Sequence, residues 1–289
     1  MLLDLMLGSL LLLSALLSLH SRNSLKSGIF FVVFGLLSGL LWVRLEAPDV
    51  AMVEIVLGSA VTSLLIFKLI ATARIKAVKV HRIRKFWAGV ISLAFLVYMI
   101  PYLLTLRKEQ RIEVLVFEKL SMSGVESPVT AVLLNFRGYD TLLEVGVITL
   151  AVFGIIALNK GDKVYVWRDP LVQSLSRWIL PMTVFFSFYV TYLGTFSVGG
   201  AFQGGSLLAG GLIFLSLTGQ DVHIGESIKK SLLLLSLLVF CGVGLMYAVT
   251  GYGFLVYPLP LSTISIILIE LSICLSTALL LYTAYRGKV

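Results

Sequence analysis

The sequence has little charge and few side chains suited to metal binding or covalent chemistry. Charged residues make up 13% of its 289 residues, against about 25% in soluble domains. It holds only two cysteines and three histidines. Cys241 and Cys274 fall in separate apolar blocks with no cysteine or histidine neighbour at ligand spacing, which argues against an iron–sulfur or zinc site. We expect no metal site and no cofactor bound by this chain.

The apolar residues, 58% of the chain, gather in blocks. The blocks are near 20 residues long and do not alternate as strands of an outer-membrane barrel do, so they predict membrane-spanning helices. The fold class is therefore an all-α polytopic membrane protein in the plasma membrane. We expect about nine transmembrane helices, near residues 2–19, 28–44, 49–71, 87–105, 139–158, 176–195, 204–219, 230–250 and 259–284.

Basic residues between the blocks predict the orientation. The segment 74–85 carries basic residues and no acidic one, so the positive-inside rule places it in the cytoplasm. The same rule puts Lys160, Lys163 and Arg286 inside, with the N-terminus outside and the C-terminus inside. The rule also explains the net charge of +8, which in a soluble protein would suggest nucleic-acid binding. The outward segment 107–137 has mixed charge, and its IEVLVF run fits a short strand or a surface helix.

The loops divide the chain into three units of three, two and four helices. Their expected bounds are 1–76, 77–160 and 161–289. The sequence shows no clear repeat among the three units and no low-complexity linker between them. The arrangement is more typical of fused small subunits than of a symmetric transporter.

The stretch 45–70 places a carboxylate, Glu54, inside an apolar helix. An ionisable side chain at membrane depth is costly and points to function. Gly58 and Ser59 would leave room for a helix, water or an ion beside it. Lys68 follows fourteen residues later, which in a regular helix gives the same face about 20 Å away. The alternative that Lys68 extends to the lipid headgroups stays open.

A second acidic site lies in NFRGYDTLLEVGVITLA. Asp140 and Glu144 are four residues apart and share a helical face, where paired carboxylates favour proton or sodium binding. Thr141 adds a hydroxyl oxygen of the kind that hard cations prefer. In the alternative interpretation Asp140 caps the helix and pairs with Arg137, which leaves Glu144 unexplained.

Two further segments are notable. TYLGTFSVGGAFQGGSLLAGG is glycine-rich and lacks a phosphate-binding pattern, so it favours close helix packing or a tight re-entry. Its candidate residues are Gly199, Gly200, Gln203, Gly204 and Gly205. In the last span, Glu270 shares a face with Thr263 and Thr277 at seven-residue spacing. This face could line a hydrated path, or the threonine hydroxyls could donate hydrogen bonds to backbone carbonyls of their own helix.

These stretches resemble the membrane module of Mrp-type multisubunit sodium/proton antiporters. EAPDVAMVEIVLGSA and SPVTAVLLNFRGYDTLLEVGVITLA are similar to the C-terminal region of the large A subunit, and the glycine-rich segment is similar to the B subunit. The three units also resemble the D, E and F membrane subunits of archaeal membrane-bound hydrogenase and its sulfane-reductase relative. The first resembles the J-type subunit of respiratory complex I.

The resemblance implies a non-catalytic membrane subunit of a probable oxidoreductase complex. It implies a sodium/proton pathway coupled to ferredoxin-driven electron transfer, with Glu54, Asp140, Glu144 and Glu270 at the family's acidic positions. The expected partners are lipid and other membrane subunits, including a large antiporter-like subunit. The family's histidine is replaced by Thr195 and its proline by Val198, which argues against proton relay by that loop.

Three alternatives follow. The chain could serve a redox-free multisubunit antiporter, or it could be a structural scaffold whose buried carboxylates specify assembly. A self-contained transporter is disfavoured by the lack of inverted repeats.

Overall fold

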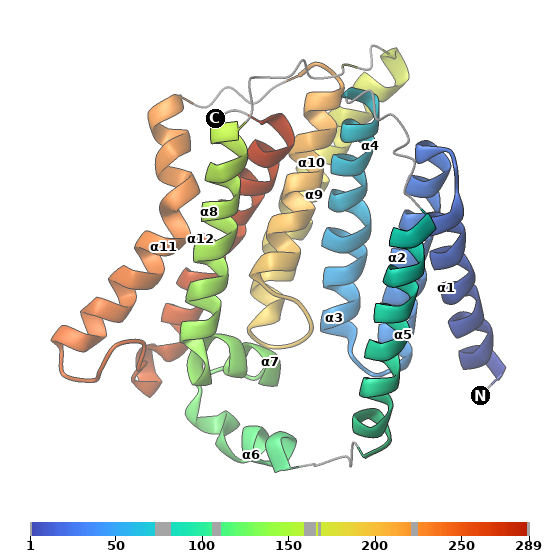
Figure 1. Cartoon of the computed structure of the whole chain (residues 1–289). Coiled ribbons are helices and arrows are strands. Elements are labelled where there is room, and N and C mark those ends of the chain that lie inside the picture. Colours follow the sequence, from blue (N-terminus) through green and yellow to red (C-terminus); the bar gives the residue numbers. More distant parts are fainter. Residues whose placement is uncertain are drawn as a thin grey trace.

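The computed structural model describes residues 2–72, 82–105, 111–158, 166, 169–220 and 225–287, and within these ranges every regular element is a helix. The helices run mostly side by side, and the two termini lie at opposite ends of the bundle (Figure 1). The elements are α1 (Leu2–His20), α2 (Ser24–Arg44), α3 (Pro48–Val53), η1 (Glu54–Val61), α4 (Thr62–Thr72), α5 (Arg82–Thr105), α6 (Arg111–Lys119), η2 (Leu120–Met122), α7 (Pro128–Thr130), η3 (Ala131–Phe136), α8 (Gly138–Leu158), α9 (Pro170–Gly194), α10 (Ala201–Leu217), α11 (Glu226–Val249) and α12 (Leu259–Arg286).

Seven of the described helices are long and apolar enough to cross a membrane, which makes this a multi-pass membrane protein. They are α1, α2, the continuous rod of α3, η1 and α4, and then α5, α8, α11 and α12. Each of the nine expected spans falls on a helix. However, α10 has only 17 residues and α9 is not among the seven. Seven crossings are thus supported, and the count of nine stays a prediction.

Helix α12 is the core of the bundle. It packs against α8, α9, α10 and α11, and Ile266, Ile269 and Ile273 are almost completely buried. Its buried positions also include serines and threonines, whose small side chains allow neighbouring helices to approach closely. The Glu270 carboxylate is therefore enclosed by protein on several sides.

The first unit packs tightly because α2 presents glycines to the rod. A Cβ atom on Gly39 would come within 2.5 Å of the Ile55 side chain, and one on Gly35 would overlap Ser59. Without those side chains the backbones of α2 and η1 lie close together. On its other side, η1 contacts α10 of the third unit. The first and third units thus form one packed body.

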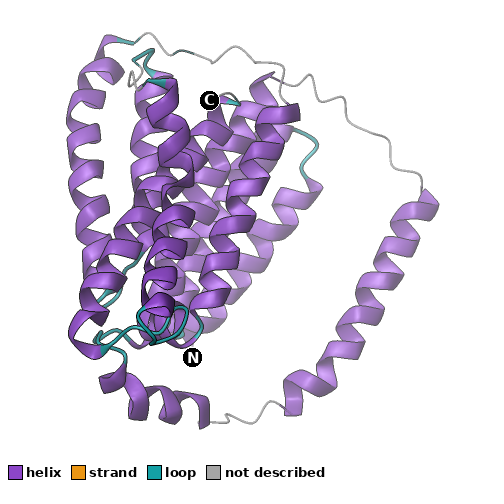
Figure 2. Cartoon of the chain, turned by 90° about the vertical axis from the view of Figure 1, so that its left-hand side faces the viewer, coloured by secondary structure: helices purple, strands orange, loops and turns teal. Residues whose placement is uncertain are grey.

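The two long helices of the second unit, α5 and α8, lie in different surroundings. Helix α8 packs on α11 and α12 through Val145 and Val152. Helix α5 stands apart from the bundle (Figure 2), and none of its described residues is buried. The IEVLVF run forms helix α6, which answers the choice between strand and helix. Four basic residues used for the orientation lie outside the described residues, namely Lys76, Lys79, Lys160 and Lys163.

Candidate functional site

The most enclosed acidic side chain of the described bundle is Glu270. Its residue is only 3% exposed, and its Oε2 accepts a hydrogen bond of 2.8 Å from the Thr195 hydroxyl. Eleven residues separate Glu270 from the start of α12 at Leu259, which places it about 17 Å into the helix. A carboxylate at this depth needs a hydrogen-bond donor, a cation or a proton.

Thr195 lies in a loop that we call the α9–α10 loop, residues 195–200, where α9 ends. Residues of the second unit form hydrogen bonds with backbone carbonyls at the start of this loop. The amides of Glu126 and Ser127 both donate to the Thr195 carbonyl at 3.2 Å. The Thr130 hydroxyl donates to the Gly194 carbonyl at 2.6 Å. Thr195 therefore joins two units, with its carbonyl bound by one and its hydroxyl directed to Glu270.

The first unit reaches the same loop through Asp49. Its Oδ1 accepts a hydrogen bond of 3.0 Å from the Gly199 amide, 150 residues along the chain. Nothing in the sequence connects Asp49 with a glycine so distant in the chain. The α9–α10 loop thus contacts all three units, and α7 lies beside it at the lower end of the bundle (Figure 1).

The glycines around this loop act through their lack of a side chain. Gly199 and Gly200 have φ of +155° and +146°, a region that L-residues with side chains rarely adopt. A Cβ on Gly204 would come within 2.5 Å of the Ser187 carbonyl oxygen on α9. A Cβ on Gly205 would come within 2.8 Å of the Cys274 carbonyl oxygen on α12. Gly204 and Gly205 thus allow α10 to pack against both neighbours.

Gln203 is buried, at 8% exposed, beside the start of α10. A Cβ on Gly200 would lie 2.8 Å from its Oε1. The amide side chain therefore fills the space that the glycine leaves open.

Glu54 begins η1, a π-helical segment that sequence reasoning missed. Its carboxylate lies against Gly58, where a Cβ would come within 3.2 Å of it, and the Ser59 hydroxyl donates to the Glu54 carbonyl at 3.1 Å. Glu54 is half-buried. No local sequence signal predicts a π-helix here, although such segments are frequent at functional sites.

The π-helix also changes the relation between Glu54 and Lys68. The expectation that they share a face used the 3.6-residue period of a regular α-helix, and η1 interrupts that period. The spacing of fourteen residues therefore does not place Glu54 and Lys68 on one face of the rod. Lys68 donates a hydrogen bond to the Tyr285 carbonyl near the end of α12, and its Nζ lies 4.9 Å from the centre of the Tyr285 ring. It joins the first unit to the third.

The second acidic site divides into separate environments. Asp140, in the first turn of α8, forms an exposed ion pair with Arg137. Thr141 is buried and donates to the Leu133 carbonyl at 2.6 Å, across the π-helical segment η3. Glu144 is exposed on the surface of this chain, so in the membrane it faces lipid or another subunit.

The structure does not gather these acidic residues in one place. Among the described residues, no group of three or more histidines, cysteines and acidic residues could hold a metal ion. Glu54, Glu144 and Glu270 lie on different helices in the three units. Any path between them would cross the contacts between units.

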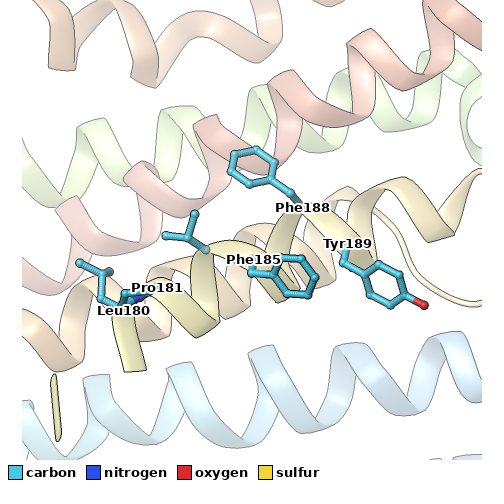
Figure 3. A pocket seen from close by; sticks show the side chains of 6 residues that line it. Leu180, Pro181, Phe185, Phe188 and Tyr189 are labelled. Atoms are coloured by element: carbon cyan, nitrogen blue, oxygen red, sulfur yellow. The ribbon is translucent and has the colours of Figure 1, made fainter. Parts of the chain in front are cut away.

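A separate hollow on α9 is apolar. It has a volume of about 750 Å³ and is lined by Leu180, Pro181, Val184, Phe185, Phe188 and Tyr189. Figure 3 shows these side chains along one helix, with Leu180 and Pro181 at one end and Tyr189 at the other. Its lining side chains carry no charge.

Two family models match the chain. Residues 9–74 match MbhD, one of the subunits of MBH, and residues 171–286 match a domain related to the MnhB subunit of a Na+/H+ antiporter. None of the curated proteins matches significantly.

Two solved structures share the fold. A chain of the Mrp complex from Dietzia sp. DQ12-45-1b superposes with a TM-score of 0.81 at 17% identity over 98% of this chain. The present chain spans 34% of that longer chain. A chain of the membrane-bound sulfane sulfur reductase (MBS), an archaeal respiratory membrane complex, gives 0.59 at 20% identity, covering 71% of this chain and 97% of that one. The chain is therefore a multi-pass membrane protein with one region similar to MbhD and another similar to MnhB, and it shares its fold with chains of an Mrp complex and of the sulfane reductase.

Proposed function

We propose that this subunit contributes part of a sodium or proton pathway within a larger membrane complex. The observation that carries the proposal is Glu270, a carboxylate almost completely buried in a membrane-spanning helix with a hydroxyl donor at 2.8 Å. An ionisable group at membrane depth is costly and characteristically marks the path of an ion or proton. Removing the carboxylate should therefore impair ion movement.

The acidic side chains would act at separate stages of the path. Glu54, in the rod, would be a protonatable or sodium-binding relay. Asp140 and Glu144 would handle ions near the outer face, with Thr141 as an oxygen donor, and Glu270 would serve the third unit. The chain itself would carry no cofactor and would depend on a large antiporter-like partner subunit to exchange ions.

Orientation is part of the proposal. Nine crossings with the N-terminus outside and the C-terminus in the cytoplasm satisfy the positive-inside rule in every strongly basic loop. The positions of the termini at opposite ends of the bundle agree with an odd number of crossings (Figure 1).

Two host complexes are compatible with this role. In the first, the module is coupled to ferredoxin-driven electron transfer, in a hydrogenase or sulfane reductase. In the second, it belongs to a redox-free sodium/proton antiporter. Both kinds of complex contain a chain of this fold: 98% of this chain superposes on a chain of an Mrp complex and 71% on a chain of the sulfane reductase.

The test is sodium uptake by inverted vesicles that contain the complete complex. We expect Glu270→Gln and Glu54→Gln to abolish sodium-coupled transport while the complex assembles normally. The matched control is Glu46→Gln, because Glu46 is exposed at the connection between α2 and α3. Normal uptake by both carboxylate variants would refute the proposal. Loss of assembly with the carboxylates neutralised would instead support a scaffold.

A further inference from the structure

We propose that Asp49 is a positioning residue, which fixes the α9–α10 loop from the first unit and so holds the Thr195 hydroxyl on Glu270. The importance of Glu270 for transport comes from the proposed function. The contact between Asp49 and the loop stands on geometry alone.

The first step is the contact itself. Asp49 Oδ1 accepts the Gly199 amide hydrogen at 3.0 Å, and Asp49 is half-buried at the start of the rod. A hydrogen bond to an ionised acceptor is stronger than one between neutral groups. Because Asp49 sits on a helix anchored against α2 and α10, it offers the loop a fixed acceptor.

The second step is that the loop cannot shift easily at this point. A side chain on Gly199 would collide with the Val190 carbonyl, and one on Gly194 would come within 2.5 Å of the Gly200 nitrogen. The Gly200 amide donates back to the Val190 carbonyl at 3.1 Å. The loop therefore lies backbone against backbone on the last turns of α9, and a pull at Gly199 is transmitted to that helix end.

The third step leads to the carboxylate. Thr195 is four residues before Gly199 in the same loop, and its hydroxyl donates to Glu270. On its other side, the Thr195 carbonyl is held by the amides of Glu126 and Ser127. Asp49 and the second unit thus hold the loop at two points, and the direction of the Thr195 hydroxyl depends on both.

A simpler role for Asp49 is to interact with the positive end of α3 through its charge. The two roles make different predictions for Asp49→Asn. Asparagine loses the charge but keeps an oxygen acceptor for the Gly199 amide. Alanine loses both. Positioning therefore predicts that asparagine restores what alanine removes, whereas a dipole role predicts that the two variants behave alike.

The first measurement is hydrogen–deuterium exchange of the peptide spanning residues 195–203 in the intact complex. We expect Asp49→Ala to speed exchange about tenfold or more, the equilibrium effect of losing one hydrogen bond to a charged group. Asp49→Asn should speed exchange by about fivefold or less, because its neutral oxygen still accepts a weaker hydrogen bond, and the exposed control Glu46→Ala should have no effect. Parental exchange in Asp49→Ala, or equal acceleration in both Asp49 variants, would overturn the proposal.

If Asp49→Ala does not assemble, Asp49→Asn decides alone. It must assemble and keep exchange within about fivefold of the parent, because its oxygen still accepts the hydrogen bond. Failure of Asp49→Asn in either respect would also overturn the proposal.

The second measurement is a double-mutant cycle on sodium uptake with Asp49→Ala and Thr195→Val. If Asp49 acts through Thr195, the double variant loses no more activity than the worse single variant. Multiplicative losses would mean independent actions and would contradict the proposal. Should Glu270→Gln transport normally, the proposed function fails, and the exchange measurement still decides whether Asp49 positions the loop.

Discussion

Gly204 on α10 offers a sharp test of how the helices of the third unit pack. A Cβ atom at this position would come within 2.5 Å of the Ser187 carbonyl oxygen and would also overlap the Thr191 hydroxyl. Both lie on α9, and the first is backbone, which cannot turn away. We therefore predict that Gly204→Ala forces α9 and α10 apart.

The expected cost can be set against a matched glycine on the same helix. Inserting a methyl group into a packed interface costs about 1–3 kcal/mol. Gly210 has no heavy atom within 4 Å of an added Cβ, so Gly210→Ala should gain up to about 1 kcal/mol from helix propensity. Because the gain in helix propensity applies to both positions of α10, the two variants should differ by about 1–3 kcal/mol in the free energy of unfolding.

The assay is thermal unfolding of the purified complex in detergent, followed by the loss of soluble folded protein. We expect the Tm of Gly204→Ala to fall by several degrees, while that of Gly210→Ala stays unchanged or rises. If Gly204→Ala is as stable as Gly210→Ala, the close approach of α9 and α10 described above does not exist.

The remaining predictions concern polar side chains with and without partners. The hydroxyls of Tyr247 and Ser265 share a hydrogen bond of 2.7 Å, so Tyr247→Phe should lower the free energy of unfolding by about 1 kcal/mol. The buried Tyr257 hydroxyl has no hydrogen-bond partner within the described part of the chain. Tyr257→Phe should therefore be neutral or stabilising in the same thermal assay. Burial, with a smaller contribution from Tyr247, raises the pKa of Tyr257. Because the unfolded chain ionises first, stability should fall above about pH 10, and less steeply in Tyr257→Phe, which chemical denaturation across pH can measure. Lys68→Met should cost about 1–2 kcal/mol by removing the cation from the Tyr285 ring and from the end of α12; an unchanged Tm would show that this contact contributes nothing.

The sequence allowed much of the helical framework to be predicted, because block length and hydropathy are local properties. The place of Glu270 within an apolar helix was predicted in the same way, whereas its burial depends on the helices that pack around α12. The contact between Asp49 and Gly199 could not be predicted, since it joins residues far apart in the chain. The exposure of Glu144 depends on which face of α8 meets α11 and α12, and periodicity alone does not fix that.

Backbone irregularities account for the other differences. The π-helix at Glu54 arises where apolar and small residues give no local signal, and it removes the regular spacing that linked Glu54 with Lys68. Helix α5 has the composition of an ordinary span, yet none of its described residues is buried. Composition predicts that a helix crosses the membrane, but the partner that it packs against is a tertiary property.

The meeting of three units at one loop has a consequence for biogenesis. Asp49, Ser127 and Thr195 belong to a single polypeptide, so the parts that they join are always synthesised in equal numbers. Their association is intramolecular and, unlike that of separate subunits, does not weaken on dilution. A cell that makes this chain therefore needs no balance of expression among these three parts.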